Sequence, residues 1–128
     1  MSWQAILAIG SGGFIGALAR VYLNGLISHK VPHDLPYGTL GVNLIGSLLM
    51  GMFVAYFMYT SVFSMNTKSF ISTGILGALT TYSTFAIESV LLLKSGHIML
   101  AMANMSLNTF GTVLAAGGGF YIVKLFFK

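Results

Sequence analysis

The segment from Gly74 to Glu88, Gly-Ile-Leu-Gly-Ala-Leu-Thr-Thr-Tyr-Ser-Thr-Phe-Ala-Ile-Glu, places five consecutive hydroxyl side chains inside a long apolar stretch. Lipid cannot hydrogen-bond such groups, so at membrane depth they must face protein or water. Gly77, together with the Thr/Ser run, is also a place where a helix can break and present bare main-chain carbonyls to an ion. The segment therefore predicts a membrane helix that is broken near its middle and carries a polar face.

The composition is that of an integral membrane protein. Of the 128 residues, 56% are hydrophobic and only 6% are charged, which is too few charges to solvate a globular surface. We predict a single all-α membrane domain with four transmembrane helices, at residues 3–27, 38–61, 69–93 and 98–126. The start of the chain, Met-Ser-Trp-Gln, lacks a basic region, so we expect the first span to be retained and not cleaved as a signal peptide.

Small residues in the first and fourth spans indicate close helix packing. Gly12 and Gly16 form a GxxxG pair, and Gly111, Ala115 and Gly119 repeat the same four-residue spacing. Such faces let another helix approach closely in a membrane.

Two features of the first span and its following loop are open to alternative interpretations. Arg20 lies late in the span, where it either extends to the headgroups or lines a water-filled vestibule that attracts an anion. His29 and His33 have metal-ligand spacing, but no third ligand supports a site, so solvated loop histidines are the preferred interpretation.

Polar residues recur at helical spacing in three of the four spans, which suggests an aqueous track between helices. An amide such as Asn43 in hydrocarbon either joins helices or lines a path. Tyr82 and Phe85 are spaced as an aromatic pair on a neighbouring face, for which core packing is the default interpretation. The three stripes are Thr39, Asn43 and Ser47; Thr81, Thr84 and Glu88; and Asn104, Asn108 and Thr112.

The distribution of basic residues gives no preferred orientation in the membrane. Three lysines are expected on the side of the N-terminus and three basic residues on the other, so the positive-inside rule predicts no preferred orientation. Such a chain can insert both ways up and pair as an antiparallel, dual-topology homodimer; the alternative is a fixed topology set by another feature. The two sets are Lys68, Lys124 and Lys128, and Arg20, Lys30 and Lys94.

The available side chains favour ion binding over catalysis. The sequence contains no acid/base pair, activated nucleophile or metal constellation, so we do not expect an enzyme. It contains no Cys, and it has no Lys/Arg cluster of the kind that binds nucleic acid. Hydroxyls, amides, aromatic ring edges and one arginine suit a small anion, whereas carbonyls at a helix break suit a small hard cation.

Three blocks of the sequence closely resemble the small bacterial fluoride channels of the Fluc/CrcB family. With the four spans and the length, the resemblance covers essentially the whole chain, and the third block is the most specific. The blocks are Gly12-Gly13-x-x-Gly16-Ala17-x-x-Arg20, then Gly38-Thr39-Leu40-x-Val42-Asn43-Leu44-x-Gly46, then Gly74-x-x-Gly77-x-Leu79-Thr80-Thr81-Tyr82-Ser83-Thr84-Phe85-x-x-Glu88.

The resemblance implies a passive fluoride channel of the bacterial inner membrane, surrounded by lipid, with two pores in an antiparallel homodimer. It implies a central structural sodium ion held by the main-chain carbonyls of Gly77 and Thr80 from both subunits. Arg20 would lie near a vestibule, and Glu88 would support the pore. The implied pore residues are Thr39, Asn43, Thr81, Tyr82, Ser83, Thr84, Phe85, Asn104, Asn108 and Thr112.

One residue departs from the family pattern, and two other classes of protein fit parts of the sequence. The family's usual aromatic pair is Phe/Phe, whereas this chain has Tyr82 with Phe85, which adds a hydroxyl group. A small dual-topology multidrug exporter fits the size and charge balance but lacks its usual first-span glutamate. A non-transporting assembly subunit has little need of three polar stripes.

Overall fold

The computed structural model describes residues 1–31 and 34–128, and the described elements are all helical. Four segments are long and apolar enough to cross a membrane: Trp3–Lys30, Tyr37–Tyr59, Met65–Lys94 and Ile98–Leu125. This confirms the predicted all-helical, four-span architecture. Of the His29/His33 pair, His33 lies outside the described residues.

Two helix ends differ from the expected boundaries by three residues or more, and local sequence explains both; the other ends agree within two residues. Helix α1 (Trp3–Lys30) runs three residues beyond Ile27 and ends just before Val31, which precedes a proline and is thereby disfavoured in a helix. The third span begins at Met65 and not at Ser69, because Ser64 caps it by accepting a hydrogen bond from Thr67 N–H at 3.2 Å.

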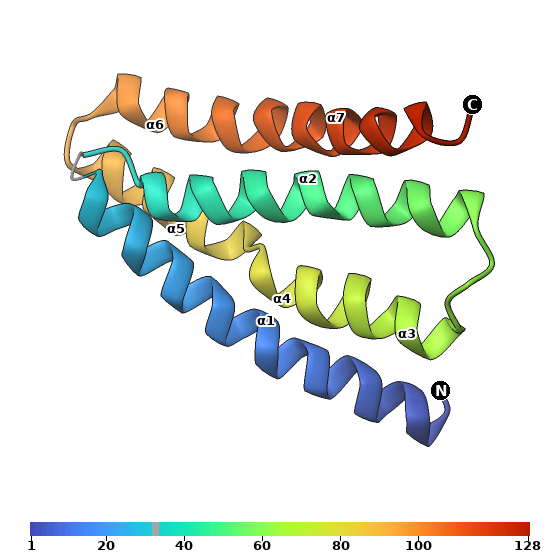
Figure 1. Cartoon of the computed structure of the whole chain (residues 1–128). Coiled ribbons are helices and arrows are strands. Elements are labelled where there is room, and N and C mark those ends of the chain that lie inside the picture. The colour runs from blue at the N-terminus through green and yellow to red at the C-terminus, as the bar shows by residue number, and fades with distance from the viewer. Residues whose placement is uncertain (32–33) are drawn as a thin grey trace.

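The four spans form two pairs (Figure 1). Helix α2 (Tyr37–Tyr59) lies along the fourth span, which consists of α6 (Ile98–Ser106), the π-helical segment η2 (Leu107–Gly111) and α7 (Thr112–Leu125). Helix α1 lies against the first half of the third span, formed by α3 (Met65–Ser69), the π-helical η1 (Phe70–Leu76) and α4 (Gly77–Leu79). Both termini and the α2–α3 connection lie at one end of the molecule.

The backbone of the third span leaves the helical conformation at Thr80 and Thr81. Thr80 has φ −82° and ψ 156°, and Thr81 has φ −148° and ψ 120°, both in the extended region. Helix α5 (Tyr82–Lys94) follows directly. Gly77 itself keeps helical angles of −64° and −34°, so these extended residues lie three and four positions beyond the glycine.

Small residues bring the paired spans into backbone contact. A Cβ atom on Gly16 would collide with the carbonyl oxygen of Ile75, and one on Gly12 would collide with that of Phe70. In the other pair, a Cβ on Gly51 would collide with the carbonyl of Ala116. The GxxxG pair in the first span therefore packs against the third span, as its spacing indicates.

This close approach predicts a large difference between two alanine substitutions on α1. Gly16→Ala forces the two backbones apart, and overpacking of this kind costs about 1–3 kcal/mol, so its apparent melting temperature in detergent should fall by several degrees. Gly13→Ala is the matched control, because a Cβ there has no neighbour within 4 Å and alanine favours the helix. Equal melting temperatures for Gly16→Ala and the parent protein would contradict this packing.

Candidate functional site

The buried side chain of Asn43 pairs with the extended backbone of the third span. Thr81 N–H donates to Asn43 Oδ1 at 2.7 Å, and Asn43 Nδ2 donates to the Thr81 carbonyl at 3.0 Å. Asn43 is only 5% exposed. A helix interruption leaves backbone groups without partners, and unpaired groups are costly away from water. The Asn43 amide satisfies both of these groups as another peptide unit would.

Because of the same interruption, the carbonyls of Gly77 and Thr80 lack the N–H donors that they would have in a continuous helix. In a continuous helix, Thr81 N–H would bond to the Gly77 carbonyl and Thr84 N–H to the Thr80 carbonyl. Here Thr81 N–H bonds to Asn43, and Thr84 N–H bonds to Thr81 Oγ1 at 3.3 Å as the N-cap of α5. These two carbonyl oxygens are therefore available to other partners.

Arg20 is one such partner. Its Nη1 donates to the Thr80 carbonyl at 3.4 Å, across from the middle of α1. Arg20 lies ten residues before the end of α1 at Lys30. The structure therefore places the Arg20 guanidinium against the third span, and its role at a vestibule or at the headgroups stays a prediction.

A chain of buried amides leads from Asn43 into the fourth span. Asn43 Nδ2 donates to Asn108 Oδ1 at 2.8 Å, and Asn108 Nδ2 donates to Asn104 Oδ1 at 3.0 Å. Asn104 Nδ2 then donates to Ser89 Oγ at 3.0 Å. Buried amides need such partners, and in a membrane they hold helices together. The chain therefore joins α2, α5 and α6–η2.

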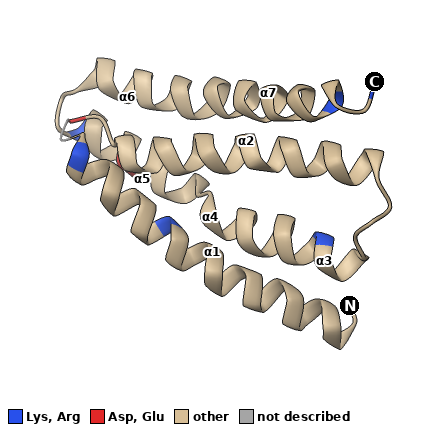
Figure 2. Cartoon of the chain, in the orientation of Figure 1, with Lys and Arg blue, Asp and Glu red and all other residues tan. Residues whose placement is uncertain are grey.

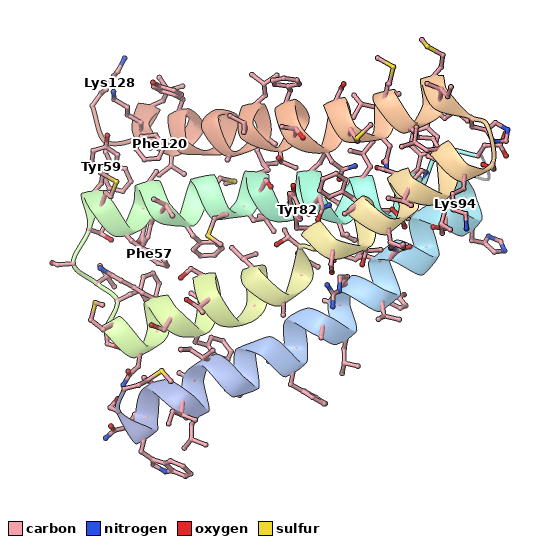
Figure 3. All side chains as sticks on the ribbon, turned by 180° about the vertical axis from the view of Figure 1, so that it is seen from behind. Phe57, Tyr59, Tyr82, Lys94, Phe120 and Lys128 are labelled. Carbon is pink, nitrogen blue, oxygen red and sulfur yellow. The ribbon has the colours of Figure 1, made fainter. Side chains whose placement is uncertain are left out.

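A polar pocket of about 350 Å³ opens beside this amide chain. Tyr82 projects from the start of α5, at mid-length of the bundle, and is 79% exposed (Figure 3). Its ring stands at 84° to that of the buried Phe85, with 4.7 Å between the centroids, which is an edge-to-face pair. The pocket is lined by Asn43, Ser47, Thr80, Thr81, Tyr82, Phe85, Asn108, Thr109 and Thr112.

The pocket brings together many of the residues predicted from the sequence, but not all of them. Four predicted pore residues, Thr39, Ser83, Thr84 and Asn104, do not line it. Ser83 is exposed on α5, and Asn104 is completely buried. The pocket includes Asn43, Thr81, Tyr82, Phe85, Asn108 and Thr112 from the predicted set. The pore role of all ten residues stays a prediction.

Three lining residues were absent from the predicted pore set: Ser47, Thr109, and Thr80, which was predicted only as a sodium ligand. Ser47 lies on the polar stripe of the second span, four residues after Asn43, so its spacing already indicated it. Thr109 follows Asn108 directly and lies off the fourth-span stripe. Asn108 and Thr109 both line the pocket although they are adjacent in sequence, and both lie in the π-helical segment η2. A regular helical repeat cannot locate such a segment, although π-helical turns occur frequently at functional sites.

Thr39 and Glu88 belong to a second polar cluster, nearer the end of the bundle that carries the α1–α2 loop. Thr39 Oγ1 donates to Glu88 Oε1 at 2.7 Å, and Asn24 Nδ2 donates to Thr39 Oγ1 at 3.3 Å. The other carboxylate oxygen, Glu88 Oε2, is buried without a hydrogen-bond partner among the described residues. Glu88 also lines a separate pocket of about 380 Å³ with Asp34 and Ser95.

The fold and these clusters define a small multi-pass membrane protein with a polar pocket at membrane depth. The sequence profile of the family described as CrcB-like protein, Camphor Resistance (CrcB), matches residues 7–120. The chain belongs to this family, which confirms the resemblance found in the sequence. The family is one of ion channels and not of enzymes.

Similar proteins match along nearly the whole chain. A protein of Sulfurimonas denitrificans named "Fluoride-specific ion channel FluC" is 74% identical over 125 residues, covering 98% of this chain and 97% of its own. A protein of the same name from Nautilia profundicola is 46% identical and covers 100% of this chain and 100% of its own. Another from Campylobacter lari is 48% identical and covers 93% of this chain and 97% of its own.

The double hydrogen bond at Asn43 predicts that its donor group matters for stability. Asn43→Asp keeps an acceptor for Thr81 N–H but loses the donor to the Thr81 carbonyl and to Asn108 Oδ1, and it buries a charge. We expect a loss of about 1–3 kcal/mol or more, measured as a lower melting temperature in detergent. Asn66→Asp makes the same chemical change at an exposed position in the first turn of α3 and should be neutral. If both variants melt like the parent, the Asn43 pairing does not stabilise the fold.

Proposed function

We propose that this protein is a passive, fluoride-selective ion channel that exports fluoride from the cytoplasm across the bacterial inner membrane. The names of the similar proteins, each a fluoride-specific ion channel, support fluoride as the ion. The observation that carries the proposal is the pocket between Asn43, Tyr82, Phe85 and the fourth span, which sets hydrogen-bond donors and aromatic edges at membrane depth. In acidic surroundings neutral HF crosses the membrane and dissociates inside, and a channel lets the trapped anion leave.

The chemistry of the pocket suits a small, strongly hydrated anion that must give up water. The hydrogens of aromatic ring edges are positive, and the edge-to-face pair of Tyr82 and Phe85 lines the pocket. The amide donors of Asn43 already bond to Thr81 and Asn108, so an ion meets them only in competition with these bonds. Sites that are each weak let an ion enter and also leave, which conduction requires.

We propose that a second copy of the chain packs over the pocket in a homodimer. Tyr82 is 79% exposed, and hydroxyl and amide groups line the space beside it at a depth where lipid cannot hydrogen-bond them. The lysines divide almost equally between the two ends, three at one and two at the other, which supports an antiparallel, dual-topology homodimer. The twofold axis of such a dimer would repeat the pocket, so we propose two pores per dimer.

The proposed structural sodium ion is consistent with the donor set at the interruption. The carbonyls of Gly77 and Thr80 have lost their helical donors to Asn43 and Thr81, and carbonyl oxygens suit a small hard cation. The same two carbonyls from a second subunit would complete the site. Arg20 donates to the Thr80 carbonyl, which has two lone pairs, so the guanidinium can orient this oxygen while leaving one lone pair for an ion. When bound, the ion would join the two third spans.

The test of the proposed function is anion efflux from liposomes that contain the purified protein, followed with ion-selective electrodes. We expect rapid fluoride efflux without chloride efflux, requiring only an ionophore to balance charge and no sodium gradient. Absence of fluoride flux from a well-folded dimer would overturn the proposal in favour of an exporter of another substrate. Fluoride flux that follows a sodium gradient would instead indicate coupled transport.

The aromatic pair predicts a specific loss of flux. Phe85→Ile removes a ring edge from the pocket while keeping an apolar side chain. Fluoride efflux should fall by at least tenfold, which corresponds to a rise of about 1.4 kcal/mol in the free-energy barrier to conduction. Phe14→Ile is the control, since Phe14 is exposed on α1 and does not line the pocket. A Phe85→Ile channel that conducts like the parent would assign this ring to packing alone.

A further inference from the structure

An apolar groove of about 400 Å³ lies between α2, the α2–α3 connection and α7, near the end of the molecule that carries both termini. It shares no residue with the polar pocket. The volume is within the range of ligand-binding clefts. Its lining is aliphatic and aromatic: Leu49, Met52, Phe53, Tyr56, Phe63 and Val123.

Three lysines surround the same end of the bundle, and each is tied to the groove through an aromatic ring or a neighbouring residue. Lys68 Nζ lies 5.6 Å from the ring centroid of Phe57, which packs edge-to-face on Phe63 at 5.7 Å. Lys124 follows the lining residue Val123, and its Nζ lies 5.5 Å from the ring centroid of Tyr121. Lys128 follows Phe127, whose ring packs on Tyr56 at 5.9 Å.

The side-chain charge at this end has one sign. Figure 2 shows lysine but no Asp or Glu there, and the chain's two acidic residues, Asp34 and Glu88, lie toward the other end. Lys30 and Lys94 lie at that other end, where Asp34 and Glu88 line the local pocket. The two ends therefore carry similar numbers of lysines but different surroundings: rings and an apolar groove at one, carboxylates at the other.

From this combination we propose that the groove is a binding site for an anionic phospholipid. One acyl chain occupies the apolar groove, and the phosphate lies beside Lys68 and Lys124. Basic pockets next to membrane helices attract anionic headgroups, and among the described residues no Asp or Glu side chain lies at this end to neutralise the lysines. The ammonium groups of Lys68 and Lys124 lie over the rings of Phe57 and Tyr121, and cation–π attraction favours these positions.

The proposal is tested on the purified full-length protein in detergent, with phosphatidylglycerol and phosphatidylcholine of identical acyl chains as probes. Native mass spectrometry measures binding, and the melting temperature measures stabilisation. Phosphatidylglycerol should bind more tightly and raise the melting temperature more. Lys68→Gln with Lys124→Gln should weaken its binding about 25-fold, since each lysine near a membrane surface contributes roughly fivefold.

A matched pair of variants separates this site from general electrostatic attraction. Lys30→Gln with Lys94→Gln removes the same charge from the opposite end and should leave phosphatidylglycerol binding within about twofold. Lys68→Arg with Lys124→Arg keeps the charge and should retain binding, which also controls for misfolding of the glutamine variants.

Four results would overturn the proposal. The first is equal affinity for the two lipids. The second is unchanged phosphatidylglycerol binding after Lys68→Gln with Lys124→Gln, and the third is an equal loss of binding in the pair at the opposite end. The fourth is stabilisation by inorganic phosphate equal to that by the lipid, which would indicate a free-anion site that does not use the groove. None of these measurements depends on fluoride transport.

Discussion

The arrangement of the polar pocket depends on one pairing, between the Asn43 side chain and the backbone of Thr81. Two extended residues at membrane depth expose an N–H and a C=O that lipid cannot satisfy. Asn43 bonds to both, so the third span can leave the helical conformation without burying unpaired groups. Because the Asn43 amide also donates to Asn108, the same side chain connects the second, third and fourth spans.

The pairing decides what the surrounding groups are free to do. Thr81 caps α5 and directs Tyr82 and Phe85 from the first turn of that helix, while the carbonyls of Gly77 and Thr80 lose their helical donors. Groups that suit an anion and carbonyl groups that suit a cation therefore lie side by side at a single interruption. The rings of Tyr82 and Phe85 and the neighbouring hydroxyl groups line the pocket, whereas the Thr80 carbonyl accepts a hydrogen bond from Arg20 of the first span.

Backbone contacts through small residues hold this arrangement in place. Gly12 and Gly16 bring α1 against η1, and Gly51 and Gly119 bring α2 against α7. In a membrane such packing takes the place of the hydrophobic effect, because lipid tails are as apolar as the helix surfaces. Close approach of α1 also brings the Arg20 guanidinium within reach of Thr80. The glycines thus determine the positions of polar groups that they do not contact.

The sequence by itself determined the membrane class, the four spans and the family, because hydropathy, the hydroxyl run and the three motif blocks are local patterns. It also placed Asn43, Asn108 and Thr112 on polar faces. Only the tertiary structure decided that Asn43 hydrogen-bonds to Thr81 and that Asn104 is buried within the amide chain. It also decided that Thr39 and Glu88 form a separate cluster and that Thr109 lines the pocket. The physical reason is that helical spacing defines which residues share a face, whereas their partners depend on how helices pack and on where the helical repeat is interrupted.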